Sequence, residues 1–249
     1  MSFDSGAASA AAPRVAIVAA LGVERASLDR QLPLRSAEWS VLQSGPGPER
    51  AARAATQALA NGAVALVSWG LVGALDAALA PGTVVMPRRV LREGSAPRRV
   101  DEAWHTRLTS LSTVFATSDG DLLTVSTALD SPQTKAAAAA ATGAVAVDME
   151  SAAIASVAAE ARVPFVALRV VVDARDDALP GDAEEWIDER GNRRLDALLR
   201  IVIKPSEWPA LLTLAQRYRV ASRVLVRLAG VVASRGLLGA SAALSDRRN

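Results

Sequence analysis

Cysteine is absent from the 249-residue sequence, and histidine occurs once, at His105. Without cysteine the chain can form neither a disulfide nor a cysteine-ligated metal site, and a reducing compartment, the cytoplasm, is expected. One histidine cannot build a metal site of several histidines, and we expect His105 to lie on the surface or in a loop. Disulfide-stabilised secreted domains and multi-histidine metalloenzymes are therefore excluded.

The sequence also lacks a long hydrophobic run and a secretion signal. The longest uncharged run, residues 54–75, contains glutamine, asparagine, serine and three glycines. It therefore predicts a helix, a turn and a buried strand rather than a membrane span. Residues 1–12 are small and polar, with no basic start or compact apolar core, and we expect a disordered tail there.

Charge is unevenly distributed although the net charge is only +2. Residues 200–249 carry nine basic and two acidic residues, whereas residues 1–199 carry 19 basic and 24 acidic ones. A basic segment favours an anionic partner, either a membrane or a nucleic acid. Only Trp208 and Tyr218 are aromatic in this segment, so it offers no stacking platform for bases, and we expect no nucleic-acid partner.

Apolar runs alternate with helical patterns along most of the chain. Strands are predicted at residues 14–21, 39–44, 63–70, 83–91 and, more weakly, near 113–116 and 122–126. Residues 131–143 predict a helix with a serine cap and a glycine stop, and residues 144–177 read as strand, helix and strand. The alternation predicts an α/β fold with a central mixed, mostly parallel sheet flanked by helices. We expect one domain over residues 13–204 and a basic, amphipathic helical C-terminal extension over residues 205–249.

Carboxylates follow several of the predicted strands. Glu24 comes just after the first strand, Asp148 and Glu150 lie where a later strand gives way to a helix, and Asp173 ends the last strand. Each of these residues alone has an ordinary explanation, such as a helix cap or a complement to a helix dipole. Side chains at the carboxyl ends of strands face the ligand crevice of an open α/β sheet, so their joint placement indicates a binding site.

Two glycine-rich segments are expected to form turns at the same edge of the sheet. One is Ser44-Gly45-Pro46-Gly47, before an alanine-rich helix, and the other is Gly70-Leu71-Val72-Gly73. A glycine turn at a helix N-terminus can bind an anion, although many such turns are only turns.

Four blocks resemble, in order and spacing over residues 14–180, those of the purine nucleoside phosphorylase and adenosylhomocysteine nucleosidase superfamily. The blocks are RVAIVAALGVERASL, SGPGPERAARAA, VSWGLVGALDAALAPGTVV and AVDMESAAIASVAAEARVPFVALRVVVDARDD. Within the superfamily, GPGPERAARAA, VDMES and RVVVDARDDALP are most similar to the hopanoid-associated phosphorylase branch, which removes adenine from adenosylhopane. The resemblance implies a nucleoside-phosphorylase-like domain, a homo-oligomer, and cleavage of the N-glycosidic bond of an adenine nucleoside.

The resemblance also implies roles for particular residues. Asp173 would donate a proton or hydrogen bond to N7 of the leaving base, and Glu24 would activate water. Glu150, with the backbone near Met149, would hold the ribose diol. Arg169, four residues before Asp173, is a candidate for tuning that acid or for a structural ion pair. The base-side positions are Gly70, Leu71, Val72 and Val172, and the nucleophile-side positions are Ser44, Gly45, Gly47 and Ser68.

The residues leave the nucleophile open. Phosphate needs a positive group or a helix N-terminus, and an ionised Glu24 would repel it. Bacterial phosphorylases of the superfamily carry arginine where this chain has Ser68, so phosphorolysis and hydrolysis are both considered, with inorganic phosphate as a co-substrate and no other cofactor. One alternative is a methylthioadenosine or adenosylhomocysteine nucleosidase. Another is a non-catalytic nucleoside- or lipid-binding module, against which the three retained acids argue.

Residues 209–232 have helical periodicity. Arg219, Arg223 and Arg227 lie opposite an apolar face. Such a helix either packs on the core or a subunit interface, or rests on an anionic membrane and brings a lipid-linked substrate to the crevice at the periphery of the inner membrane. The apolar face comprises Leu211, Leu214, Tyr218, Ala221, Leu225, Leu228 and Val232.

Overall fold

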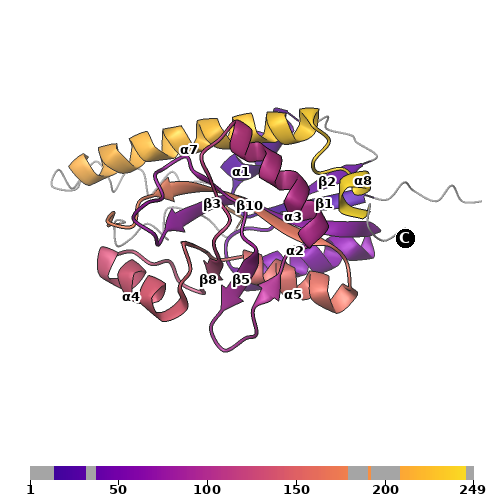
Figure 1. Cartoon of the computed structure of the whole chain (residues 1–249), viewed down its shortest axis with the longest axis horizontal. Helices are drawn as coiled ribbons and strands as arrows, with labels where there is room; N and C mark the ends of the chain where they lie inside the picture. The colour runs from indigo at the N-terminus through magenta and orange to yellow at the C-terminus, as the bar shows by residue number, and fades with distance from the viewer. Residues whose placement is uncertain (1–13, 32–37, 179–189, 192–207, 245–249) are drawn as a thin grey trace, which may run out of the picture.

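A ten-stranded sheet runs through the protein, with α1 and α7 on one side and α2 and α5 on the other (Figure 1). The computed structural model describes residues 14–31, 38–178, 190–191 and 208–244. The strands are β1 (Arg14–Ala19), β2 (Trp39–Gln43), β3 (Ala63–Ala74), β4 (Val84–Val85), β5 (Arg89–Arg92), β6 (Arg98–Arg99), β7 (Thr117–Ser118), β8 (Leu122–Thr124), β9 (Ala146–Asp148) and β10 (Phe165–Asp173). The helices are α1 (Gly22–Asp29), α2 (Pro48–Ala60), α3 (Glu102–Leu108), the 3₁₀ helix η1 (Thr109–Thr113), α4 (Pro132–Thr142), α5 (Ser151–Ala161), α7 (Trp208–Ser234) and α8 (Ala240–Leu244).

The sheet is mixed and mostly parallel, which confirms the predicted fold class. β1 pairs in parallel with β2 and β3, and β3 pairs in parallel with β10. The pairs β4–β7, β5–β8 and β8–β9 are also parallel, whereas β10–β4, β3–β9 and β5–β6 are antiparallel. Strands β1, β3 and β10 are almost wholly buried, because helices cover both of their faces.

Small side chains let α2 and α5 approach each other and the sheet. Both helices turn mainly alanine toward the interior, and a face without bulky side chains allows close packing of helix against strand. The buried alanines are Ala51, Ala55 and Ala58 of α2 and Ala152, Ala153, Ala155 and Ala158 of α5.

Strand β3 continues through the segment that was predicted to be a turn. Leu71 and Val72 pair with Val170 and Val171 of β10, so the strand ends at Ala74 rather than at Gly70. The predicted strand over residues 83–91 is instead divided into β4 and β5 around Pro87, whose missing N–H cannot join a ladder.

Strand β9 runs in the opposite direction to β3, and this determines where Asp148 lies. Gly73 of β3 pairs with Val147, and β9 runs antiparallel to β3. The chain after Val147 therefore runs beside β3 in the direction of Gly70. Asp148 lies next to β3, and not past the carboxyl ends of parallel strands as the sequence had suggested.

The prediction for His105 is wrong. His105 lies on the inner side of α3, is 3% exposed, and has Nε2 2.9 Å from the carbonyl oxygen of Met86. The Asp101 side chain caps this helix by accepting from the N–H of Trp104 at 2.9 Å. The ring nitrogen of His105 has a hydrogen-bond partner in the backbone carbonyl of Met86, which is what allows the histidine to be buried.

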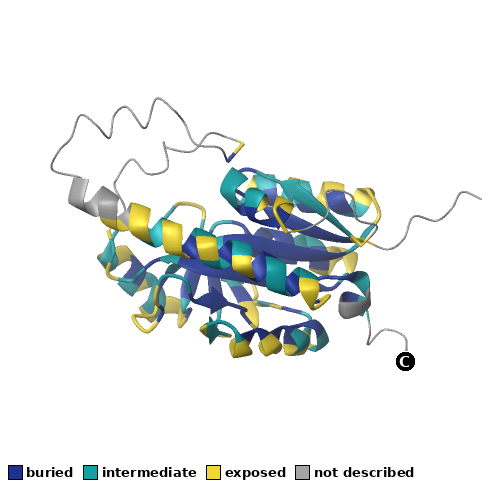
Figure 2. Ribbon diagram, turned by 90° about the horizontal axis from the view of Figure 1, so that it is seen from above, coloured by how far each residue is buried: buried dark blue, intermediate teal, exposed yellow. Residues whose placement is uncertain are grey.

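The apolar side of α7 packs on β10 and α1. Figure 2, seen from above, shows the helix lying over the buried strands of the sheet. Ala221, Leu225, Leu228 and Val232 are buried, which agrees with the predicted face, while Tyr218 is partly exposed. The side chains of Leu211 and Leu214 lie outside the described residues. The predicted basic face is exposed at Arg219, Arg223 and Arg227, and Arg227 stacks 5.3 Å from the Phe115 ring centre. Within the described ranges, no helix combines the length and the hydropathy needed to cross a bilayer.

Packing of α7 predicts a measurable contribution to stability. Leu228 is fully buried, so Leu228→Ala should lower the free energy of unfolding by about 2–5 kcal/mol. Val220, on the same helix, is 43% exposed, and Val220→Ala should change it by less than about 0.5 kcal/mol. Urea unfolding of both variants checks this, and equal effects would contradict the packing described.

Candidate active site

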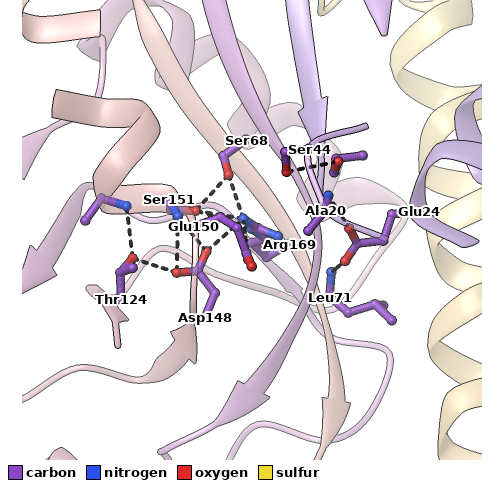
Figure 3. A network of polar contacts seen from close by, with 12 residues as sticks. Ala20, Glu24, Ser44, Ser68, Leu71, Thr124, Asp148, Glu150, Ser151 and Arg169 are labelled. Atoms are coloured by element: carbon purple, nitrogen blue, oxygen red, sulfur yellow. Dashed lines mark hydrogen bonds and ion pairs between the residues drawn. The ribbon is translucent and has the colours of Figure 1, made fainter. Parts of the chain in front are cut away.

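A buried arginine lies at the centre of a polar network beside β3 (Figure 3). Arg169 of β10 is 1% exposed, and its Nη2 is 2.8 Å from Oδ2 of Asp148. The same nitrogen donates to Ser68 Oγ at 2.6 Å and to Ser151 Oγ at 3.1 Å. Oε2 of Glu150 lies 3.8 Å away. One guanidinium thus joins β3, β9, β10 and the start of α5.

Asp148 fixes the position of that arginine. Its Oδ1 accepts from Thr124 Oγ1 at 2.6 Å, and its two oxygens lie 3.3 and 3.2 Å from the backbone N–H of Ser151. Thr124 Oγ1 in turn accepts from the N–H of Ala152 at 2.9 Å. Asp148 is thereby surrounded by protein donors, which indicates a supporting role rather than direct contact with a ligand.

Glu24 lies in the first turn of α1, and its carboxylate is held by backbone groups. Oε2 accepts from the N–H groups of Ala20 and Leu21, each at 2.9 Å, and Oε1 accepts from that of Leu71 at 2.8 Å. Burial raises the pKa of Glu24, while Arg169 and these three hydrogen bonds oppose the rise.

Gly70 has no side chain, and this leaves room for Glu24 and Arg169 to lie near each other. A Cβ there would lie 2.2 Å from Glu24 Oε1 and 2.5 Å from Arg169 Nη1. Arg169 Nη1 is buried and donates to none of the described residues. The two charged groups therefore face each other beside a backbone that has no side chain.

Glu150 connects this network to the glycine turn before α2. Its Oε1 accepts from the N–H of Gly47 at 2.9 Å, and Gly47 has a φ of 99°, in the region that favours glycine. Burial raises the pKa of Glu150 to about 7; Asp148 and Glu24 add to the rise, and Arg169 and the Gly47 N–H oppose it.

Asp173 lies farther along the same pair of strands. It is 4% exposed, pairs with Gly73 across the sheet, and forms a buried ion pair with Lys135 of α4. A Cβ at Gly73 would lie 3.1 Å from its Oδ2, so glycine again leaves room for an acid. Burial raises the pKa of Asp173, with Lys135 and Arg217 opposing.

The acids therefore form two clusters along β3. Glu24 and Glu150 lie around Arg169 near Gly70, and Asp173 lies near Gly73. Three residues of strand correspond to about 10 Å at about 3.3 Å per residue, which is comparable to the length of a ribose joined to a purine.

The remaining predicted residues differ in how they face this region. Ser68 lies inside β3, is fully buried, and is 2.9 Å from Ser151 Oγ, so it belongs to the network and not to a loop. Ser44 donates to the carbonyl of Gly45 at 2.7 Å. Leu71, Met149 and Val172 are partly exposed, whereas Val72 is buried.

Of the two alternatives considered for Arg169, the structure shows the ion pair and gives the contact with Asp173 to Lys135. The ion-pair partner of Arg169 is Asp148, and that of Asp173 is Lys135, which the sequence alone did not single out. A signal was present, because the chain has 26 arginines and only two lysines, at positions 135 and 204. Ser151 and Thr124 were also missed, since hydroxyl groups are too common in sequences to stand out. Within the described ranges, no three His, Cys, Asp or Glu residues are arranged to hold a metal ion.

Comparisons with known proteins agree with this architecture. A family model described as the Phosphorylase superfamily matches residues 34–204. The 5′-methylthioadenosine/S-adenosylhomocysteine nucleosidase of Helicobacter pylori, solved in complex with a substituted pyrrolidinol, superposes with a TM-score of 0.67 at 13% identity, covering 91% of this chain and 100% of that one. Futalosine hydrolase of the same organism gives 0.64 at 15% identity, covering 88% and 97%. The Neisseria meningitidis nucleosidase gives 0.64 at 18% identity, covering 89% and 99%. No curated protein matches the sequence. At these identities, the structural likeness shows the fold alone.

The pKa of Glu150 predicts a specific dependence of stability on pH. It is about 7 in the folded protein against an ordinary value of 4.5, so the folded state holds this proton more tightly. The resulting stabilisation is complete below about pH 4.5 and is lost as the pH rises through about 7. Relative to Glu150→Gln, the free energy of unfolding should fall across this window by up to about 3 kcal/mol, at about 1.36 kcal/mol per pH unit. Urea unfolding from pH 4 to 8 measures the difference, and parallel curves would contradict it.

Proposed function

The chain belongs to the Phosphorylase superfamily, and within it we propose that the protein releases adenine from an adenine nucleoside by cleaving the N-glycosidic bond. The observation that carries the proposal is the placement of two buried acids with raised pKa, Glu24 and Asp173, at two levels of the β3–β10 pair. One acid can serve the nucleophile and the other the leaving base, with the sugar between them.

Asp173 is the proposed general acid. Breaking the bond between C1′ and N9 leaves negative charge on the purine, which a proton or hydrogen bond at N7 neutralises. Because burial raises the pKa of Asp173, more of it is protonated near neutral pH than of an exposed aspartate.

Glu150 is the proposed ribose ligand. An ionised carboxylate accepts two hydrogen bonds, which matches the two hydroxyl groups of a 2′,3′-diol. Its Oε1 already accepts from Gly47, so the glycine turn orients the carboxylate toward the sugar. Met149 is partly exposed beside it and provides an apolar surface.

Water is the proposed nucleophile. Glu24 Oε1 and the unpartnered Nη1 of Arg169 lie on either side of Gly70, where a water molecule can accept from the arginine and donate to the glutamate. A carboxylate with a raised pKa is a stronger base than an exposed one, as general-base catalysis requires. Ionised Glu24 and Glu150 would repel phosphate from the same place.

Phosphorolysis is the second candidate, and one observation favours it. Arg50, Arg53 and Arg190 line a groove of about 690 Å³ together with Ser44 of the glycine turn. Guanidinium groups bind phosphate well, and an anion in this groove would lie next to the turn that contacts Glu150.

Adenosylhopane is the proposed substrate, with methylthioadenosine and adenosylhomocysteine as alternatives. The sequence resemblance favours the lipid, and the partly exposed side chains of Leu71 and Val172 give the site apolar surface. The exposed arginines of α7 could contact anionic headgroups, while its apolar side is already occupied by the core. Contact with a membrane would then be electrostatic and should weaken as salt rises.

The choice of nucleophile is tested by following free adenine with and without phosphate. Adenosylhopane in vesicles, a short-chain 5′-alkyl adenosine and methylthioadenosine are the probes. We expect turnover that does not depend on phosphate, the 5′-substituted ribose as the second product, and a loss of about 10²-fold or more for Glu24→Gln. Formation of the corresponding 5′-substituted ribose 1-phosphate with a many-fold gain from phosphate would establish phosphorolysis instead.

The acid is tested separately with Asp173→Asn. The amide cannot give up a proton, so kcat should fall by about 10²-fold or more, while KM changes less. Steady-state kinetics with the most active of the same probes gives both constants. A variant that kept more than half of the wild-type turnover would remove Asp173 from the reaction.

A further inference from the structure

Helix α4 buries one described residue, and that residue is a lysine. Lys135 is 1% exposed, whereas the alanines that follow it are partly or fully exposed. Ser131 caps the helix and Gly143 ends it in a left-handed conformation, so the helix itself is an ordinary alanine-rich one. Ala138 and Ala139 pack against a small apolar cluster, but the one side chain of α4 that is fully enclosed carries a positive charge.

Every hydrogen of the Lys135 ammonium has an acceptor. Nζ is paired with Oδ2 of Asp173, and it donates to the carbonyl oxygens of Ala174 and Asp177, each at 3.0 Å. An ammonium group has three N–H donors, and these three bonds use all of them. Lys135 thus fixes one oxygen of Asp173 together with the backbone that follows it.

Other charges around Asp173 are few. Asp177 accepts from the N–H of Ala174 at 2.7 Å and forms an ion pair with Arg217 of α7. Lys135 from α4 and Arg217 from α7 are the charges that act on this acid, and Arg175, Asp176 and Asp177 follow it directly in the chain. Glu24, Glu150 and Arg169 belong to the cluster near Gly70.

Stability does not account for this arrangement. Taking an ammonium and a carboxylate out of water costs several kcal/mol each, and apolar replacements of buried ion pairs are often neutral or stabilising. An apolar residue on α4 would cover the sheet at lower cost, so the lysine is better explained by what it does to Asp173.

We propose that Lys135 is a positioning residue that makes Asp173 a usable acid, by holding Oδ2 and stabilising the carboxylate left when the proton goes to the leaving base. This inference rests on the proposed function. In the step, the O–H bond of Asp173 breaks and an N–H bond forms at N7, while the electrons of the C1′–N9 bond pass into the purine. Lys135 keeps its protons throughout, and its charge balances the new carboxylate.

The proposal predicts that removing the charge of Lys135 lowers kcat and extends activity to higher pH. Without the positive charge, Asp173 keeps its proton to higher pH but gives it up less readily. Lys135→Met and Lys135→Gln should therefore lower the plateau of kcat by about 10²-fold, as for loss of acid catalysis. They should also move the basic limb of the pH–rate profile to higher pH. Lys135→Arg keeps the charge and should keep the limb near its wild-type position, and Arg217→Gln should move it less than Lys135→Met.

The experiment follows adenine release from methylthioadenosine or the 5′-alkyl adenosine between pH 5 and 10, with folding checked by circular dichroism. A purely structural lysine would lower the rate or the stability without moving the limb, and that result would overturn the proposal. If the methionine variant does not fold, the glutamine variant gives the same test.

A second measurement separates this inference from the proposed function. The carboxyl ¹³C signal of Asp173, assigned by its loss in Asp173→Asn, can be titrated without any substrate. A titration that moves to higher pH in the Lys135 variants supports the link between the two residues even if no probe is cleaved. If the titration of Asp173 is the same in the Lys135 variants as in the wild type, the link is overturned. If the titration shifts but the basic limb of the pH–rate profile does not, the catalytic role of Lys135 is overturned.

Discussion

The buried ion pair between Arg169 and Asp148 is the interaction on which the site depends. A guanidinium that is removed from water must be paired and hydrogen-bonded, and here a carboxylate and two serine hydroxyls meet that need at Nε and Nη2, while Nη1 has no partner among the described residues. In doing so it joins three strands and a helix start at one point. It is also the positive charge that partly offsets the burial of Glu24 and Glu150, so the protonation of both acids depends on it.

Strand β3 determines the distance between the two clusters of acids. It is long enough to pair with β1 and β10 along its length and with β9 at its end, so groups from distant parts of the sequence come to lie beside it. At Gly70 and Gly73 the missing side chain leaves the space that Glu24 and Asp173 occupy. The distance between the two clusters is therefore a property of the strand and not of flexible loops.

Much of the fold could be predicted because β1, β2, α2, α4, α5 and β10 carry local signals: apolar runs, a serine cap, a glycine stop. Residues 70–73 misled the prediction, since glycine usually marks a turn, and only the pairing with Val170 and Val171 keeps them in the strand. The burial of His105 and Lys135 depends on partners 19 and 38 residues away, which periodicity cannot reveal. The sequence singled out the acids and Arg169, but not Lys135, Ser151 or Thr124.

The pairing of β3 with β10 also has a consequence for how the chain reaches its native state. Leu66 is aligned with Phe165, so a long loop must close before these strands can meet, and pairings of this kind form slowly. Until β10 pairs with β3, Arg169 lacks its buried partners and stays hydrated. Its desolvation therefore accompanies the pairing of β10. During synthesis, the ribosome must release the chain past residue 173 before the sheet can close. Shorter nascent chains therefore carry Glu24 and Gly70 without the charge that completes the site, and they expose the apolar edge of β3 to chaperones or to neighbouring chains.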